Sequence, residues 1–210
     1  SVFAGIAFSM ILFAFGGIGG IINASYTLNA LVHNTTWIVG HFHLTVATAV
    51  TLTFMVSSYV LIPAIFNKAI IFKKLTVLQP YLWFIGMTIF STAFHIAGLY
   101  GMPRRTADIL YGGLAPSIWI ELAQIAAIGG VILWVSGVIF IFNSGTSILK
   151  GAHVAMDAGS LFEKVNEKET ILDRISVWVI LAIIIIILAY VFPFLQIYSR
   201  GLSPAPPLPP

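Results

Sequence analysis

Two histidines stand one residue apart in an otherwise apolar stretch, WIVGHFHLTV, at residues 37–46. The first Asp, Glu, Lys or Arg of the chain is Lys68, so the segment around these histidines carries no fixed charge. Ionisable side chains are costly inside a membrane and by default indicate a functional site. On an α-helix, positions i and i+2 point about 200° apart, so His41 and His43 should face opposite ways. They cannot chelate one ion together, but each can ligate a separate metal centre.

An arginine pair, Arg104 and Arg105, follows the third apolar segment in GLYGMPRRTAD. Imidazole is a common axial ligand of haem iron, and the two haem propionates would give the arginines anionic partners. Gly40 would let a flat ring approach the backbone beside His41. Two haems flanking one helix, with propionates turned to the arginines, is the simplest arrangement that uses all these residues. Two plainer interpretations remain open: a membrane histidine can hydrogen-bond a neighbouring helix, and an arginine pair can anchor a helix at the interface.

The composition indicates what kind of element must position these residues. The chain is 59% hydrophobic and only 8% charged, with a mean hydropathy of +1.02, whereas soluble domains carry about 25% charged residues. We therefore expect an all-α integral membrane protein embedded in a lipid bilayer. The net charge of +3 arises from few charged residues and does not indicate a nucleic-acid partner. The absence of cysteine excludes disulfides and thiolate metal sites in this chain.

A helix needs about 20 apolar residues to cross a bilayer. This length predicts five transmembrane helices, at residues 2–24, 37–65, 77–100, 117–143 and 174–198. The predicted organisation is a four-helix part at 1–143 with the haem-ligand and propionate-binding segments, a charged loop at 144–173, the last helix at 174–198 and a Pro-rich tail at 199–210. Small residues permit close helix contact, which we expect at the glycines of the first helix: Gly16, Gly17, Gly19 and Gly20.

The basic residues predict the orientation. Seven of the ten Lys and Arg residues lie in the loops 66–76 and 144–173 or at Arg174, which begins the last predicted helix. Five helices put these loops on one side, and the positive-inside rule makes that side cytoplasmic. The N-terminus is then cytoplasmic, the C-terminus is external, and the histidines and arginines share the outer end.

The segments HNTTWIVGHFHLTVATAVTLTFMV, at 33–56, and HIAGLYGMPRRT, at 95–106, closely resemble subunit I of the haem–copper oxygen reductases, most nearly the B-type branch. The resemblance covers nearly the whole chain, which is similar to the last five helices of that subunit. It implies that His41 is the ligand of the high-spin haem iron and the catalytic residue of this chain. It further implies that His43 ligates the low-spin haem iron, that Phe42 lies between the two rings, and that Arg104 and Arg105 bind propionates.

The resemblance also assigns His33 and Asn29 to the surroundings of the propionates. Asn29 stands where relatives carry an aspartate. Because an amide cannot share a titrating proton, any proton-loading role shifts toward His33, since histidine changes charge near neutral pH. The family further requires a copper ion held by three histidines, a crosslinked tyrosine and a second axial histidine for the low-spin haem. This chain cannot supply that set, so we expect residues outside it to hold the copper.

The resemblance implies a part of the catalytic subunit of a respiratory terminal oxidase. That enzyme carries electrons through two haems to O2 and couples the reaction to proton translocation across a prokaryotic plasma membrane. The expected partners are the remainder of subunit I, a subunit II-like electron-entry subunit, other small membrane subunits, and an electron donor that is a cytochrome c, a copper protein or a quinol. Two alternatives remain open: a nitric oxide reductase-like haem subunit, and a non-catalytic membrane subunit or transporter with a polar histidine path.

Overall fold

A computed structural model describes residues 2–108, 110–154, 171 and 175–200. The described residues form two units, one in the part of the chain up to 161 and the other after it, and each is described by itself. Most of the predicted charged loop and nearly all of the predicted Pro-rich tail lie outside the described residues.

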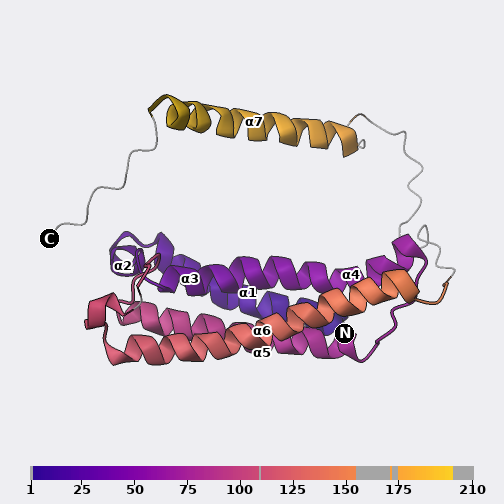
Figure 1. Cartoon of the computed structure of the whole chain (residues 1–210), viewed down its shortest axis with the longest axis horizontal. Helices are drawn as coiled ribbons and strands as arrows, with labels where there is room; N and C mark the ends of the chain where they lie inside the picture. The colour runs from indigo at the N-terminus through magenta and orange to yellow at the C-terminus, as the bar shows by residue number, and fades with distance from the viewer. Residues whose placement is uncertain (1, 109, 155–170, 172–174, 201–210) are drawn as a thin grey trace. The chain divides into compact units, whose positions relative to one another are not determined.

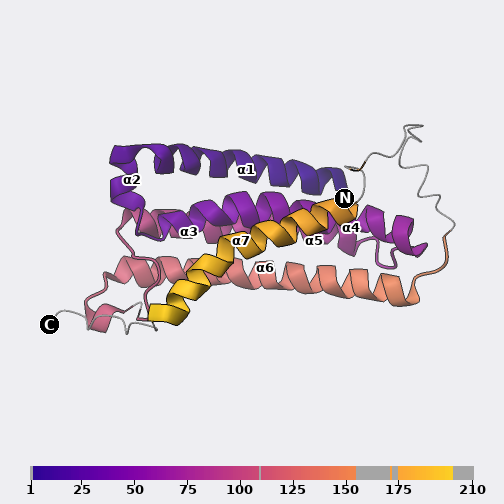
Figure 2. The ribbon, with the colours of Figure 1, turned by 90° about the horizontal axis from the view of Figure 1, so that it is seen from above.

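All described elements are helical (Figures 1 and 2). The first unit contains, in chain order, α1 (Val2–Ala24), α2 (Tyr26–Val32), α3 (Trp37–Phe42), the π-helix η1 (His43–Val50), α4 (Thr51–Phe66), α5 (Leu75–Leu99), the 3-10 helix η2 (Tyr111–Gly113) and α6 (Ser117–Lys150). The second unit contains α7 (Ile175–Arg200). The expected all-α membrane fold is confirmed.

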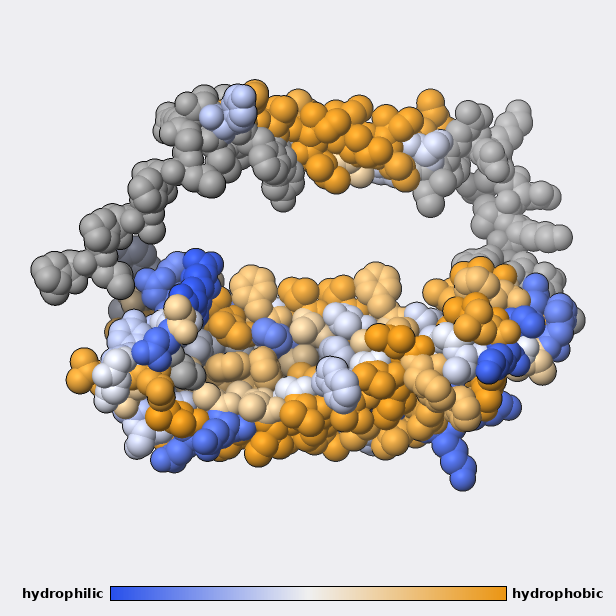
Figure 3. Space-filling model, viewed as in Figure 1, coloured by the Kyte–Doolittle hydropathy of each residue, from blue (hydrophilic) through white to orange (hydrophobic). Residues whose placement is uncertain are grey.

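Four of the five expected membrane helices are long and apolar enough to cross a bilayer: Val2–Ala24, the continuous run Trp37–Phe66, Leu75–Leu99 and Ser117–Lys150. Figure 3 shows the same division on the surface of the first unit, where hydrophilic residues gather at its two ends and hydrophobic residues lie between. Within α7 the described apolar stretch is the shorter Ser176–Leu188, so a fifth membrane crossing stays a prediction.

The helix α1 runs antiparallel to the long helix α3–η1–α4. Its buried face consists of small side chains and one leucine: Gly5, Ser9, Leu12, Gly16 and Gly19. A Cβ at Gly5 would overlap Cγ1 of Val56, and one at Gly16 would lie 2.6 Å from Cγ2 of Thr45. Because these contacts leave no room for a side chain, the glycines set how closely the two helices approach. The predicted close contact is confirmed at Gly16 and Gly19, whereas a Cβ at Gly17 would meet nothing within 4 Å.

The pair α5 and α6 is also antiparallel and is the most extensive contact in the unit. A Cβ at Gly86 would lie 2.9 Å from the Gly129 carbonyl oxygen, so backbone meets backbone there. Toward the basic loops, the fully buried Gln79 donates to Ser136 Oγ at 3.1 Å, and Ser136 donates back to the Gln79 carbonyl at 2.8 Å. These reciprocal bonds satisfy polar groups that lipid could not.

The two basic loops meet at one end of the first unit, as the charge pattern predicts. The Ala69 N–H donates to the Ala152 carbonyl at 2.9 Å, and the Val154 N–H donates to the Asn67 carbonyl at 3.0 Å. Contrary to the expected boundary at 143, α6 continues to Lys150. Its last turns are held because Asn143 bonds both the N–H and the carbonyl of Phe72 at 3.2 Å.

Candidate functional site

The two histidines lie where α3 passes into the π-helix η1, and their rings contact different helices. A Cβ built at Gly19 of α1 would lie 3.2 Å from His41 Nδ1, so the His41 ring packs against α1. The His43 ring lies against Phe90 of α5, with ring centroids 4.6 Å apart. The two imidazoles therefore have different neighbouring helices, as the i, i+2 spacing leads one to expect.

Each imidazole donates from Nδ1 to a backbone carbonyl. His41 Nδ1 lies 2.9 Å from the Gly16 carbonyl oxygen, and His43 Nδ1 lies 2.7 Å from the Val39 carbonyl oxygen. A carbonyl oxygen only accepts, so Nδ1 must carry the proton in both rings. With Nδ1 as the donor, Nε2 is the ring atom that can offer a lone pair to a metal, and a bonded Nδ1 is the arrangement that orients a histidine as a metal ligand.

The carbonyls around the pair are bonded by side chains as well as by the helix. Thr45 donates to the carbonyls of His41 at 3.1 Å and Phe42 at 3.3 Å, and Thr48 donates to the His43 carbonyl at 3.0 Å. In a π-helix the backbone bonds run from i to i+5, so carbonyls at its start lose their usual partners. The threonine hydroxyls give the carbonyls of His41, Phe42 and His43 a side-chain donor at the start of this uncommon form.

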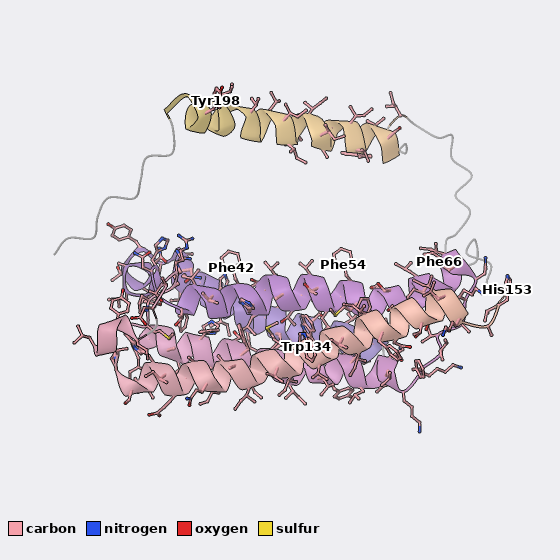
Figure 4. The ribbon with its side chains drawn as sticks, in the orientation of Figure 1. Phe42, Phe54, Phe66, Trp134, His153 and Tyr198 are labelled. Carbon is pink, nitrogen blue, oxygen red and sulfur yellow. The ribbon has the colours of Figure 1, made fainter. Side chains whose placement is uncertain are left out.

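Phe42 occupies the position between the two histidines and projects away from the helix bundle. Its side chain is 55% exposed, and its ring centroid lies 5.7 Å from that of His41. Figure 4 shows Phe42 and Phe54 on the same side of the long helix, pointing away from α5 and α6. The described helices of the unit therefore leave this side of the His41–His43 segment uncovered.

The arginine pair lies beside the entrance to α3. Backbone bonds join the segment after α5 to the segment before α3: the Thr36 N–H donates to the Met102 carbonyl at 2.9 Å, and the Arg104 N–H donates to the Asn34 carbonyl at 3.0 Å. The predicted meeting of the histidine and arginine segments at one end is thus observed. Arg105 adopts a φ of 63°, the left-handed region that is costly for a residue with a side chain.

Arg104 contains a buried donor without a partner. Its Nε atom is shielded from solvent and has no hydrogen-bond acceptor among the described residues. An unpaired buried donor costs about 1–3 kcal/mol, and more when the group is charged. The position therefore favours an acceptor, ideally an anionic one, supplied from outside the described part of the chain.

Asn29 lies on the short helix α2 and His33 follows directly after its end. The His33 Nδ1 atom lies 3.4 Å from Asn29 Oδ1. His33 is exposed, and it precedes the segment 34–36, whose backbone bonds the loop that carries Arg104 and Arg105.

Asp108 shapes the continuation of this loop after the arginines. Its carboxylate accepts from the N–H groups of Gly112 at 2.9 Å and Leu110 at 2.8 Å, and these two bonds lower the Asp108 pKa.

Gly40 differs from the expectation that it leaves room for a flat ring. A Cβ at Gly40 would lie 2.5 Å from His95 Nδ1 and 2.9 Å from the Ser91 carbonyl oxygen. The space is taken by α5, because α3 and α5 pack almost backbone to backbone at this point. Ser91, which sequence reasoning missed, bonds Gly40 directly; the only signal for it was its position one helical turn before His95.

Within the described ranges, no three His, Asp or Glu side chains lie together as a ligand cluster for one ion. His41 and His43 each offer one nitrogen, which is what an iron in a planar macrocycle takes from one axial side.

Comparison with known proteins connects this geometry with one family. The family model described as cytochrome c and quinol oxidase polypeptide I matches residues 2–132. The chain is 35% identical over 200 residues to cytochrome c oxidase subunit 1 of Thermus thermophilus, covering 91% of this chain and 35% of that protein. It is 28% identical over 142 residues to cytochrome c oxidase subunit 1 of Yarrowia lipolytica, covering 68% of this chain and 25% of that protein.

A solved structure agrees with the sequence relatives. The cryo-EM structure of a heme-copper terminal oxidase dimer matches with a TM-score of 0.69 at 33% identity, over 90% of this chain and 34% of that one. The chain thus spans about a third of the length of this structure and of the Thermus relative.

Proposed function

The chain belongs to the cytochrome c and quinol oxidase polypeptide I family, and from that premise we propose that it forms part of the catalytic subunit of a respiratory haem–copper terminal oxidase. It would act as the C-terminal part of subunit I. Its role would be to hold the two haems through which electrons reach O2 in a reaction coupled to proton translocation. The observation that carries this proposal is the pair of imidazoles that lie against different helices, each with Nδ1 bonded to a backbone carbonyl.

The residues present fit haem. His41 would ligate the high-spin haem iron and His43 the low-spin haem iron, each through Nε2, because its Nδ1 is already bonded to a carbonyl. Phe42 projects from the uncovered side of the helix between the two ligands. Arg104 has a buried donor in need of an acceptor, which a propionate would provide, and Arg105 adjoins it.

The chemistry divides between the cofactors and this chain. When bound, the low-spin haem supplies one-electron transfer, and the high-spin haem together with copper supplies the place where O2 is reduced. His41 and His43 would each hold one iron. The arginines would neutralise the propionates, and His33, whose Nδ1 lies 3.4 Å from the Asn29 amide oxygen, would be the group that accepts and releases a proton, because an amide cannot. Copper, the second ligand of the low-spin haem and the crosslinked tyrosine come from the remainder of subunit I.

The proposed setting is a prokaryotic plasma membrane, with the N-terminus cytoplasmic and the C-terminus external. The meeting of the basic loops at one end and of the histidine and arginine segments at the other supports this orientation. The proposed partners are the remainder of subunit I, an electron-entry subunit similar to subunit II, and other small membrane subunits. The electron donor would be a cytochrome c, a copper protein or a quinol.

The test is a carbon monoxide difference spectrum of the dithionite-reduced complex, purified through this chain. We expect a shifted high-spin haem band above an unshifted low-spin one. His41→Ala should abolish the carbon monoxide shift while keeping the low-spin band, and His43→Ala should remove the low-spin band. Added imidazole should restore part of the lost ligation in each case. His153→Ala, at the opposite end of the bundle, is the matched control and should leave both bands intact.

The outcomes separate the alternatives. An intact complex without haem absorbance would overturn the oxidase proposal and favour a transporter or structural subunit. Haem binding with turnover of nitric oxide and none of O2 would favour a nitric oxide reductase. Loss of both haem signals from either single variant in an assembled complex would contradict the division of roles between His41 and His43.

A further inference from the structure

Ser91 lies at the closest approach of α5 to the helix that carries the two histidines. It is fully buried, and its Oγ donates to the Gly40 carbonyl oxygen at 2.7 Å. Most hydroxyls in this unit instead bond a carbonyl of their own helix or turn; Ser9, for example, donates to Gly5 at 2.9 Å. The bond from Ser91 to Gly40 therefore joins two helices where an ordinary membrane serine would join one turn to the next.

The acceptor of this bond is the peptide group that connects Gly40 to His41. The same carbonyl also accepts the backbone N–H of His43. The start of the π-helix shifts the backbone bonding at this point, so the orientation of this peptide is not fixed by a regular α-helical ladder. A buried donor from another helix supplies that missing constraint directly beside the His41 backbone.

His95 holds the serine in place. Its Nδ1 donates to the Ser91 carbonyl oxygen at 2.8 Å and lies 3.2 Å from Ser91 Oγ. Because Ser91 Oγ already donates its proton to Gly40, it can only accept from His95. The His95 ring fills the space that a side chain at Gly40 would need, and Trp37 packs edge-on against it with centroids 4.6 Å apart.

We propose that Ser91 is a positioning residue for the His41 ligand, through the chain of hydrogen bonds His95–Ser91–Gly40. This inference rests on the proposed haem ligation by His41. The serine hydroxyl fixes the Gly40–His41 peptide against α5, while the Gly16 carbonyl of α1 accepts the hydrogen bond from the His41 ring. Two helices thus determine how the free Nε2 of His41 is aimed.

The test measures the iron–histidine stretching band of the reduced high-spin haem by resonance Raman spectroscopy, on the whole complex. Ser91→Ala should shift and broaden this band, because the Gly40–His41 peptide loses its side-chain hydrogen bond to α5 while only the bond from the His41 ring to Gly16 remains. Ser91→Thr, which keeps a hydroxyl, should restore the wild-type band position. Ser9→Ala is the matched control: it removes an equally buried serine hydroxyl that bonds only its own helix, and it should leave the band unchanged.

The low-spin haem absorbance reports that each variant has assembled. If Ser91→Ala does not assemble, Ser91→Cys keeps the side-chain size with a weak donor and should give the same shift. An unchanged band in an assembled Ser91→Ala or Ser91→Cys complex would overturn this inference alone. Absence of the iron–histidine band from the wild-type complex would overturn it together with the proposed function.

Discussion

The two candidate ligands differ in what fixes their rings. His43 donates to Val39, four residues earlier in the same helix, so its orientation is a local property of the chain. His41 donates to Gly16 of α1, so its orientation depends on how two helices pack. Changes in the contact between α1 and α3 should therefore affect the site of His41 more than that of His43.

The arginines can be tested through the reduction potentials of the haems. If the arginines bind haem propionates as proposed, replacing Arg104 or Arg105 by Gln removes a positive charge near them, so reduction becomes less favourable and the potential should fall. The fall should be larger for Arg104→Gln, because Arg104 is half-buried and Arg105 is exposed to screening by solvent. A redox titration followed in the haem bands measures both variants.

Lys73→Gln, at the opposite end of the bundle, provides the control for a general effect of charge. Potentials that stay at the wild-type value in both arginine variants would instead favour the interpretation that the pair anchors the helix at the membrane interface.

The sequence was sufficient to single out, as candidates, the residues that carry charge or a lone pair in an apolar setting. His41, His43 and the arginines stand out because such side chains are costly in lipid. It was not sufficient for Ser91, because a serine is common in membrane helices and only the packing of α5 on Gly40 gives it a distinct partner. The role predicted for Gly40, to leave room for a flat ring, was wrong for the same reason. Its missing side chain could be explained equally well by a ligand or by a neighbouring helix, and the structure places the helix α5 there.

At the scale of elements, glycine contacts determine where the helices cross. A Cβ at Gly129 of α6 would lie 2.6 Å from the Phe90 nitrogen and 2.7 Å from the Gly86 carbonyl oxygen. Both atoms belong to the backbone of α5 and cannot move aside without moving the helix. The crossing of α5 and α6 therefore depends on this one position more than on the flexible side chains around it.

This dependence predicts a contrast between two glycines of the same helix. Gly129→Ala should lower the stability of the complex by about 1–3 kcal/mol, because overpacking forces the helices apart. Gly137→Ala should be neutral or stabilising by up to about 1 kcal/mol, because nothing lies within 4 Å of its Cβ position and alanine favours the helix. Thermal unfolding in detergent measures both, and equal effects would contradict the assigned crossing.

The boundaries of the elements were predicted less well than their number in the first unit. Four apolar segments gave four membrane helices, because length and hydropathy decide that question. The extension of α6 to Lys150 depends on Asn143 and Ser147, which bond the backbone of the loop between α4 and α5. Such contacts join residues more than seventy positions apart and leave no local pattern in the sequence.

At the scale of the whole molecule, the predicted orientation can be tested by labelling, because the chain contains no cysteine. Leu114→Cys, in the loop after the arginines, should react with a membrane-impermeant maleimide added to intact cells. Lys73→Cys, in the basic loop, should react only after the cells are lysed. Both positions are exposed, so lysed cells should label both variants. The reverse pattern would contradict a cytoplasmic N-terminus.

The π-helix at His43–Val50 has a consequence for the angular phase of the long helix. A stretch bonded from i to i+5 behaves as an α-helix with one residue inserted, and one residue turns an α-helix by about 100°. His41 before this stretch, His43 at its start and the buried Leu52, Val56 and Tyr59 after it are therefore set about 100° apart from where a regular helix would put them. Deleting a single residue within 44–50 would restore a regular helix, yet it would turn either the half with the proposed haem ligands or the packing half away from its neighbours.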